Sequence, residues 1–357
     1  MAIAKRSSLV IKSLLVAVVL VGLVACETIG YYGQAAQGQL AILWNRERIN
    51  DLLTEQELPA ELRDKLTTVL QIREFATGEL LLPAGDSYLS YVELDREHVV
   101  WNVFAAPEFS VDPVSWCYPI AGCVSYRGYF SEAGALSFAD RLQQQGYDVY
   151  TGGVDAYSTL GWFDDPLLST VIKRQDYQLA TLIFHELAHQ LVYVPGDTTF
   201  NESFATALEQ EGLRRWLDWQ GDSVTLERAQ QETLRRQQFV DLVIDYREKF
   251  SELYQQELQE TEKRLRKAEL QELMRLAYRD LKQSWGGIGA YDRWFESSLN
   301  NAQLSTVSSY NELVPAFTKL LQEEGGDLEA FYTRIAELAD MDAKDRDRLL
   351  TGEGSET

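Results

Sequence analysis

Histidine and positive charge are both scarce in this chain of 357 residues. It has three histidines, and its 33 Lys and Arg face 55 Asp and Glu, for a formal net charge of −22. A surface this acidic repels nucleic acid and anionic lipid, and no basic aromatic patch offsets it. The composition therefore argues against nucleic-acid partners. Its 45% of hydrophobic residues provide ample material for a globular core.

Glycine and proline are absent from 222–285, a stretch dense in Glu, Gln, Arg and Leu. Without these helix breakers the stretch is expected to form long amphipathic helix folded as a hairpin, with its charges on a solvated face. A partner-binding coiled coil is the alternative. A last helical portion is expected over 290–349. Near the amino end, 31–82 has a helical pattern, whereas the Tyr-, Trp-, Gly- and Pro-rich segment 83–165 predicts a small sheet.

The apolar run near the amino end, "SLLVAVVLVGLVA", is too short for a comfortable membrane span. Lys5, Arg6 and Lys12 precede it, as in a secretory signal. The run leads into "LVAC", which resembles a bacterial lipobox in which Cys26 is acylated. Glu27 stands where Asp would signal inner-membrane retention. The resemblance thus implies a lipid-anchored envelope protein, in the outer membrane and facing the periplasm; an uncleaved anchor helix is the alternative.

Cysteine is scarce too, with three residues. If Cys26 carries lipid, Cys117 and Cys123 are the only pair left, six residues apart in "SWCYPIAGCVSY". An exported compartment permits disulfides, so we expect these two residues to be bridged. Two buried free thiols are the alternative, and a metal site is disfavoured because no histidine lies nearby.

The segment "TLIFHELAHQL" at 181–191 places His185 and His189 on one face of a helix, because residues four apart align. Two imidazoles so placed can hold one small cation, while Glu186 beside them activates a water, a pattern typical of zinc hydrolases. Apart from Glu186 the segment carries no charge, so the helix is expected to be buried. Buried histidines need a partner, which a metal ion supplies. Histidines merely hydrogen-bonded in a core are the alternative.

A catalytic zinc usually has three protein ligands and one open position. The segment "GDTTFNESFATALEQEG" predicts a tight turn and a second helix, with Glu202 in its first turn facing the first helix. Ligation by two His and one Glu from consecutive helices follows the gluzincin scheme, and "NESFA" resembles its Asn-Glu motif, which implicates Asn201 in substrate binding. Asp197 and Glu209 are reserve ligands, and His98 is a poor candidate. A carboxylate complementing the helix dipole is the alternative for Glu202.

The predicted fold is α+β and predominantly helical, a zincin-like metallopeptidase with a small β-sheet and a long helical C-terminal part. We expect a lipoprotein signal peptide at 1–25. A zinc-binding catalytic region would follow over 26–222, comprising the N-terminal helices, the small sheet and the two motif helices. A helical C-terminal region would occupy 223–357.

Nearly the whole mature chain resembles one family, the predicted zinc aminopeptidases among bacterial lipoproteins. The segments that carry the resemblance, in order, are "YYGQAAQGQ", "IREFA", "LLLP", "VVWNVFAAP", "WCYPIAGCVSYRGYF", "AYSTLGWFDDP", "FHELAHQ", "DTTFNESFAT" and "NNAQL". The resemblance implies a zincin-type peptidase acting on peptides. It implies one zinc per chain bound by His185, His189 and Glu202, with Glu186 as the base.

Peptide hydrolysis by such an enzyme also needs a donor to the negatively charged oxygen of the tetrahedral intermediate. Tyr157 and Tyr310 are the first candidates, followed by Tyr126, Arg127 and Tyr129. Arg127 is also a candidate for substrate binding. For each of these residues a structural aromatic contact or an ion pair is the alternative.

Asp164 and Asp165 are candidates to hold the free amino group of a substrate, in which case hydrolysis would proceed from the amino end. Capping of the helix expected after Pro166 is the alternative for both. Three other functions stay open: a zinc endopeptidase, an amidase acting on cell-wall amides, and a catalytically silent envelope protein that binds partners through the long hairpin.

Overall fold

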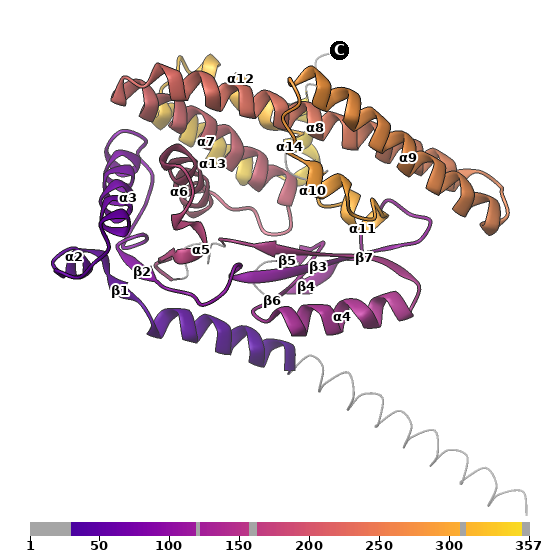
Figure 1. Ribbon diagram of the computed structural model, residues 1–357. Helices are drawn as coiled ribbons and strands as arrows, with labels where there is room; N and C mark the ends of the chain where they lie inside the picture. The colour runs from indigo at the N-terminus through magenta and orange to yellow at the C-terminus, as the bar shows by residue number, and fades with distance from the viewer. Residues whose placement is uncertain (1–29, 119–121, 157–162, 308–311, 352–357) are drawn as a thin grey trace, which may run out of the picture.

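The computed structural model describes residues 30–118, 122–156, 163–307 and 312–351 of the protein (Figure 1). Within these ranges the chain is mostly helical with three small sheets, as predicted for an α+β protein. None of the described helices is long and apolar enough to cross a membrane. Three candidate residues fall outside the described ranges: Cys26, Tyr157 and Tyr310.

The region predicted as helical over 31–82 contains a helix over residues 30–44 and α3 (Ala60–Gly78). Pro59 is the N-cap of α3. Between the two helices the chain forms β1 (Glu47–Arg48) and α2 (Ile49–Leu52). β1 pairs with β2 (Ser90–Val92), which also pairs in parallel with β8 (Leu167–Leu168). This small sheet therefore joins three distant parts of the chain.

The main sheet has the order β6-β3-β7 and is antiparallel throughout. Its strands are β3 (Val100–Pro107), β6 (Arg127–Tyr129) and β7 (Tyr147–Val154). Side chains alternate along β3, so that Val103 and Ala105 face α4 (Glu132–Gln144), whereas Phe104 and Ala106 face α11 (Asn301–Leu304). Helix α4 lies within the segment 83–165, for which the sequence predicted only a sheet. Its N-terminus is nevertheless capped by Ser131, a sequence signal for a helix start.

The hairpin formed by β4 (Trp116–Tyr118) and β5 (Gly122–Val124) pairs Cys117 directly with Cys123. A disulfide joins these two residues. Gly122 has φ +73°, and a Cβ on it would meet the backbone nitrogen of Gly196 at 2.9 Å. The hairpin thus packs against the loop formed by residues 192–197.

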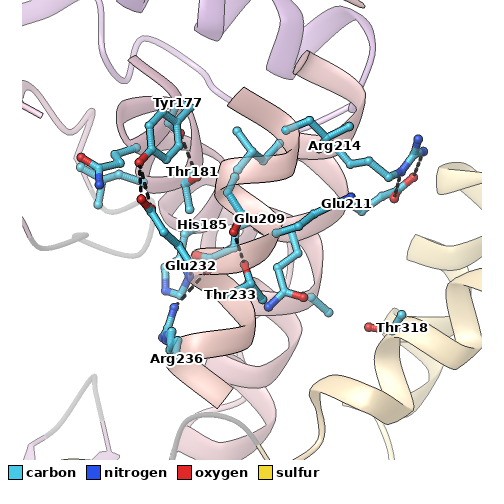
Figure 2. Close-up of a pocket in the computed structure, with 18 of the residues that line it drawn as sticks. Tyr177, Thr181, His185, Glu209, Glu211, Arg214, Glu232, Thr233, Arg236 and Thr318 are labelled. Atoms are coloured by element: carbon cyan, nitrogen blue, oxygen red, sulfur yellow. Dashed lines mark hydrogen bonds and ion pairs between the residues drawn. The ribbon is translucent and has the colours of Figure 1, made fainter. Parts of the chain in front are cut away.

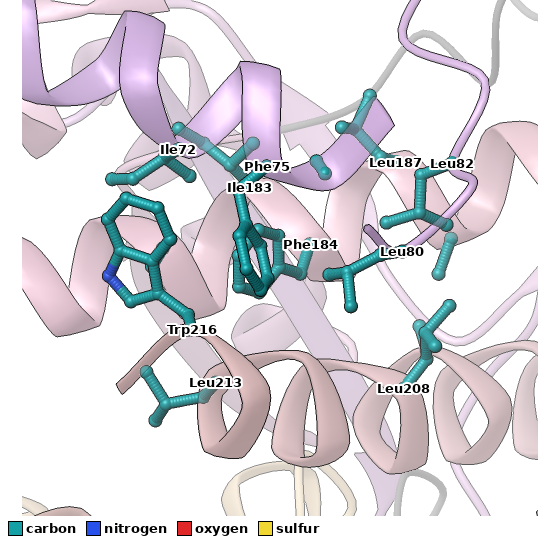
Figure 3. Close-up of a cluster of buried hydrophobic side chains, with 14 of the residues drawn as sticks. Ile72, Phe75, Leu80, Leu82, Ile183, Phe184, Leu187, Leu208, Leu213 and Trp216 are labelled. Carbon is teal, nitrogen blue, oxygen red and sulfur yellow. The ribbon is translucent and has the colours of Figure 1, made fainter. Parts of the chain in front are cut away.

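The largest apolar core surrounds α6 (Asp176–Leu191) and α7 (Thr198–Gln220) (Figure 3). Phe75 of α3 contacts Phe184 of α6 and Trp216 of α7, with ring centroids 6.1 and 5.1 Å apart. On the other side of α7, Phe204 packs against Phe317 and Phe331 from the C-terminal helices. Helix α7 is therefore held by aromatic contacts from both α3 and the C-terminal helices, and this core includes chain from both sides of residue 222.

The Gly- and Pro-free stretch forms a helical hairpin of α8 (Ser223–Gln255) and α9 (Glu260–Ser284). A second core lies between them, built around Val243, Phe250 and Met274. Lys267 of α9 is buried and forms an ion pair with Asp148 of the main sheet at 2.6 Å, which fixes the hairpin to the sheet. The remaining helices are α5 (Ser169–Ile172), α10 (Asp292–Phe295), α12 (Val314–Glu323), α13 (Leu328–Ala339) and α14 (Ala343–Thr351).

Candidate metal centre

Helix α6 carries the two motif histidines. It begins with a capping box, in which the side chains of Gln175 and Gln178 each accept a hydrogen bond from the other residue's backbone N–H. The helix then continues through a sequence that is apolar on nearly all sides. His185 and His189 project from one face, and their Nε2 atoms lie 3.2 Å apart. Two imidazole nitrogens at this distance face a common point.

Helix α7 brings Glu202 to the same point. Its N-cap is Asp197, whose side chain accepts a hydrogen bond from the backbone of Phe200. Glu202 Oε2 lies 3.3 Å from Nε2 of His185, and Oε1 lies 3.7 Å from Nε2 of His189. Metal-ligand bonds of about 2.1 Å at tetrahedral angles would place ligand atoms about 3.4 Å apart. The cluster His185, His189 and Glu202 could therefore hold a small cation, as was predicted for these residues.

The short loop between the two helices depends on Asn201. Its side chain is buried, accepts a hydrogen bond from the backbone N–H of Val194 at 2.7 Å and donates one to the carbonyl of Val194 at 2.8 Å. Asn201 was a candidate for substrate binding, but its amide is engaged in these two bonds. Asp197, a reserve ligand, is likewise engaged, because it caps α7 and pairs with the buried Arg346 of α14.

Glu209, the other reserve ligand, lies behind the cluster. Its Oε2 is 2.8 Å from Nδ1 of His185, and its Oε1 is 3.4 Å from Nη1 of Arg236 on α8. A histidine that gives one nitrogen to a metal usually donates a hydrogen bond through the other, which fixes its ring orientation. The geometry matches that of such an orienting carboxylate rather than a ligand.

The two histidines differ in basicity. Burial lowers the pKa of His185, but hydrogen bonds to Glu202 and then Glu209 outweigh it and raise this pKa well above its ordinary value. The pKa of His189 is lowered to about 4 by burial and by the neighbouring His185. His189 is thus neutral near pH 7, as a metal ligand must be, whereas His185 has to release a proton before it can bind a metal.

Glu186 follows the first histidine and is half-buried. Burial is the main cause that raises its pKa, to about 7; His185 lowers it, and the carboxylates of Glu202, Asp165 and Glu209 raise it. A carboxyl group with a pKa near neutrality can both accept and return a proton at physiological pH.

Three tyrosines adjoin the cluster. Burial and then Glu202 raise the pKa of Tyr126, while burial and then Glu186 raise the pKa of Tyr88. Burial and Glu202 likewise raise the pKa of Tyr193, whose ring centroid lies 6.4 Å from that of His189. Each phenol therefore keeps its proton and can donate it in a hydrogen bond. Tyr126 was a second-rank candidate, whereas Tyr88 and Tyr193 were missed, although Tyr193 follows His189 by four residues.

The remaining candidates lie in different surroundings. Asp165 is buried and acts electrostatically on Glu186, whereas Asp164 is exposed and accepts a hydrogen bond from the backbone of Asp86. The guanidinium carbon of Arg127 lies 4.1 Å from the ring centroid of Tyr31 and 4.8 Å from that of Phe138, so this residue stacks between aromatic rings. Tyr129 is buried in the core between the main sheet and α4. His98 pairs with Asp155 at 2.6 Å.

A groove leads away from the cluster along α6 (Figure 2). It has a volume of about 1230 Å³ and is lined by residues of α6, α7, α8 and α12. His185, Glu186 and Glu209 are among the lining residues, so the groove adjoins both the base candidate and the carboxylate that contacts Nδ1 of the first histidine.

Comparison with known proteins identifies one family model, and its match includes every residue of the candidate metal site. A family model described as "Putative aminopeptidase" matches residues 30–350. No curated protein and no solved structure shows a significant match. The matched range includes α6 and α7, the main sheet and the C-terminal helices, and it confirms the resemblance to aminopeptidases. The chain therefore belongs to this family of putative aminopeptidases.

Proposed function

We propose that the protein is a zinc-dependent aminopeptidase that hydrolyses the first peptide bond of its substrates. The observation that carries the proposal is the convergence of His185, His189 and Glu202, with distances of 3.2, 3.3 and 3.7 Å between their ligand atoms. Two imidazole nitrogens and one carboxylate group at this spacing are a donor set that suits zinc. When bound, zinc supplies a Lewis acid that polarises the substrate carbonyl and lowers the pKa of water.

Glu186 is the proposed proton carrier. Its pKa of about 7 allows it to take a proton from the attacking water and to deliver it to the departing amine. The half-buried Tyr126 is the proposed donor of a hydrogen bond to the carbonyl oxygen as negative charge develops there, and its electrostatic interactions with Glu202 and Glu186 support this role. Tyr157 and Tyr310 stay candidates for the same role.

Asp165 is the proposed acceptor for the free amino group of the substrate. It is buried, and its charge raises the pKa of Glu186, so the two carboxyl groups lie in one electrostatic environment. An ammonium group in this environment would be stabilised, and a blocked amino terminus would lose that interaction. Asp164 is less suited, because its carboxylate is exposed and bonded to Asp86.

We further propose that the protein works at the cell envelope, attached through lipid on Cys26. The motif "LVAC" and the short apolar run before it support this location. A single lipid chain binds membranes only weakly, so the several chains of a bacterial lipoprotein would be needed for a stable anchor.

The experiment that tests the proposed activity uses matched peptides. The zinc-loaded protein is incubated with a peptide mixture in free and N-acetylated forms, and the cleavage positions are determined by mass spectrometry. We expect loss of the first residue from free peptides and strong suppression by acetylation. Equal cleavage of both forms, or cuts mainly in the interior, would instead indicate an endopeptidase. Cleavage of cell-wall amides but not of peptides would indicate an amidase.

A further inference from the structure

The groove along α6 is continuous with the proposed active site. Tyr177 and Thr181 precede His185 by steps of four residues, so the three lie on one face of α6 and form the floor (Figure 2). Glu209 on α7 and Arg236 on α8 line the walls beside His185. A ligand bound along this floor would extend to Glu186, the proposed base.

Among the polar side chains that line the groove, those not paired with an opposite charge are mostly neutral hydrogen-bonding groups. Its charged side chains largely neutralise one another: Arg214 pairs with Glu211 at 2.8 Å, and Arg236 lies 3.4 Å from Glu209. The remaining polar side chains are amides and hydroxyls. Part of their capacity is used within the protein, because Gln178 accepts a hydrogen bond from the backbone of Gln175, and Thr181 and Thr233 each donate one to a carbonyl of their own helix. Each still has at least one donor or acceptor site for the main-chain N–H and C=O groups of a peptide. Six of these side chains are Gln178, Thr181, Gln210, Gln230, Thr233 and Gln322.

The length of the groove floor determines how many residues of an extended peptide can bind along it. Tyr177 precedes Glu186 by nine residues, which corresponds to about 14 Å of helix. An extended chain advances about 3.3 Å per residue, so the floor accommodates about four residues. The volume of about 1230 Å³ is large for a small-molecule pocket and leaves room for their side chains.

We infer that the groove binds the residues that follow the scissile bond of an oligopeptide, mainly through their main chain. This inference rests on the proposed aminopeptidase activity, since an aminopeptidase has a single substrate residue on the amino side of the bond and the remainder must lie elsewhere. The protein is accordingly an oligopeptide-trimming enzyme that prefers substrates of about five residues or more over dipeptides.

A ladder of peptides with one amino-terminal residue and increasing length tests the inference. KM is measured with the zinc-loaded protein, and Kd is measured by fluorescence anisotropy with the zinc-loaded Glu186→Gln protein, so that binding is read independently of turnover. We expect both constants to fall about tenfold between the dipeptide and the pentapeptide and then to level off, the gain of one or two net hydrogen bonds.

Thr233→Trp obstructs the groove, and Leu234→Trp is the matched control. Thr233 is exposed on α8 and lines the groove, whereas Leu234 is the next residue, 51% exposed, and does not line it. The first variant should lose the dependence of KM and Kd on peptide length, and the second should behave like the parent throughout.

The possible outcomes distinguish the groove assignment from the proposed aminopeptidase activity. Cleavage of dipeptides without any dependence of KM or Kd on length would overturn the groove assignment and leave the aminopeptidase proposal standing. Length-dependent binding that Thr233→Trp weakens, in a parent protein that cleaves no peptide, would support the groove and contradict the activity. Length-dependent binding that Thr233→Trp does not change would place the peptide elsewhere and overturn the inference.

Discussion

Glu209 accepts a hydrogen bond from Nδ1 of His185 at a distance of 2.8 Å, and it lies on the same helix as Glu202. The two carboxylates are seven residues apart, about two helical turns, so α7 presents both to α6 on one face. Glu202 contacts Nε2 of His185, and Glu209 contacts Nδ1 of the same ring. A single helix thus supplies both a proposed ligand and the group that orients another ligand.

Glu209→Ala is expected to weaken zinc binding about 10- to 100-fold, because His185 loses the partner that holds its ring. Zinc affinity is measured by competition with a chromophoric chelator. Glu211→Ala is the matched control, since Glu211 lies on the same helix and pairs with Arg214 and Arg215 instead. Unchanged affinity in Glu209→Ala would show that the bond has no role in metal binding.

Zinc binding should also depend on pH. The raised pKa of His185 means that, near neutrality, the metal-free protein holds a proton that zinc must displace. The apparent Kd should therefore weaken about tenfold for each unit of pH decrease below that pKa, for one proton displaced. Glu209→Gln removes a carboxylate that raises this pKa and should shift the dependence to lower pH. A Kd that is constant between pH 6 and pH 8 would contradict the proton displacement.

Asn201→Ala should destabilise the protein by about 1–3 kcal/mol, because the N–H of the half-buried Val194 loses its partner and the C=O of Val194 loses one of its two donors. Urea unfolding of the metal-free protein measures this change. Thr199→Ala, a half-buried position in the same first turn, should cost less. If the two substitutions have equal effects on the free energy of unfolding, Asn201 does not stabilise the loop.

Tyr126→Phe is expected to lower kcat about 100-fold or more while zinc content stays unchanged, because one donor to the developing oxyanion is removed. Steady-state kinetics on a free peptide measures the effect. Tyr129→Phe, in the core between sheet and helix, is the control. An unchanged kcat in Tyr126→Phe would transfer the donor role to Tyr193, Tyr157 or Tyr310.

The envelope location can be tested through Cys26 and the disulfide. Cys26→Ala should abolish acylation and release the protein from membranes, and intact mass measurement of the parent should show the lipid. The Cys117–Cys123 pair should leave no alkylatable thiol in the unreduced protein. A Cys26→Ala protein that is processed and membrane-held like the parent would exclude lipidation at this residue.

Local spacing predicted part of the site. The four-residue interval between His185 and His189 defines a helical face, and the capped start before Glu202 brings a carboxylate toward it. Both signals lie within one or two helical turns, which is why they can be read from sequence. The helical hairpin was equally predictable, because residues 222–285 lack Gly and Pro and are rich in the helix-forming residues Glu, Gln, Arg and Leu.

Contacts between distant segments could not be read in the same way. Asn201 carries the motif of a substrate-binding residue, but its bonds to Val194 depend on how the loop closes in three dimensions. Tyr126 lies in the connection between β5 and β6 and interacts electrostatically with Glu202, whereas Glu209 lies on α7 and contacts His185. No periodic pattern links residues so far apart, so their roles follow only from the fold.

The zinc content per chain is the most direct test of the proposed metal centre. Plasma mass spectrometry of the purified parent should give about one zinc per chain, and Glu186→Gln should retain it while losing turnover. Glu202→Ala should lose most of the zinc, because one of the three proposed ligands is removed. Full zinc occupancy and full peptidase activity in Glu202→Ala would contradict the proposed metal centre.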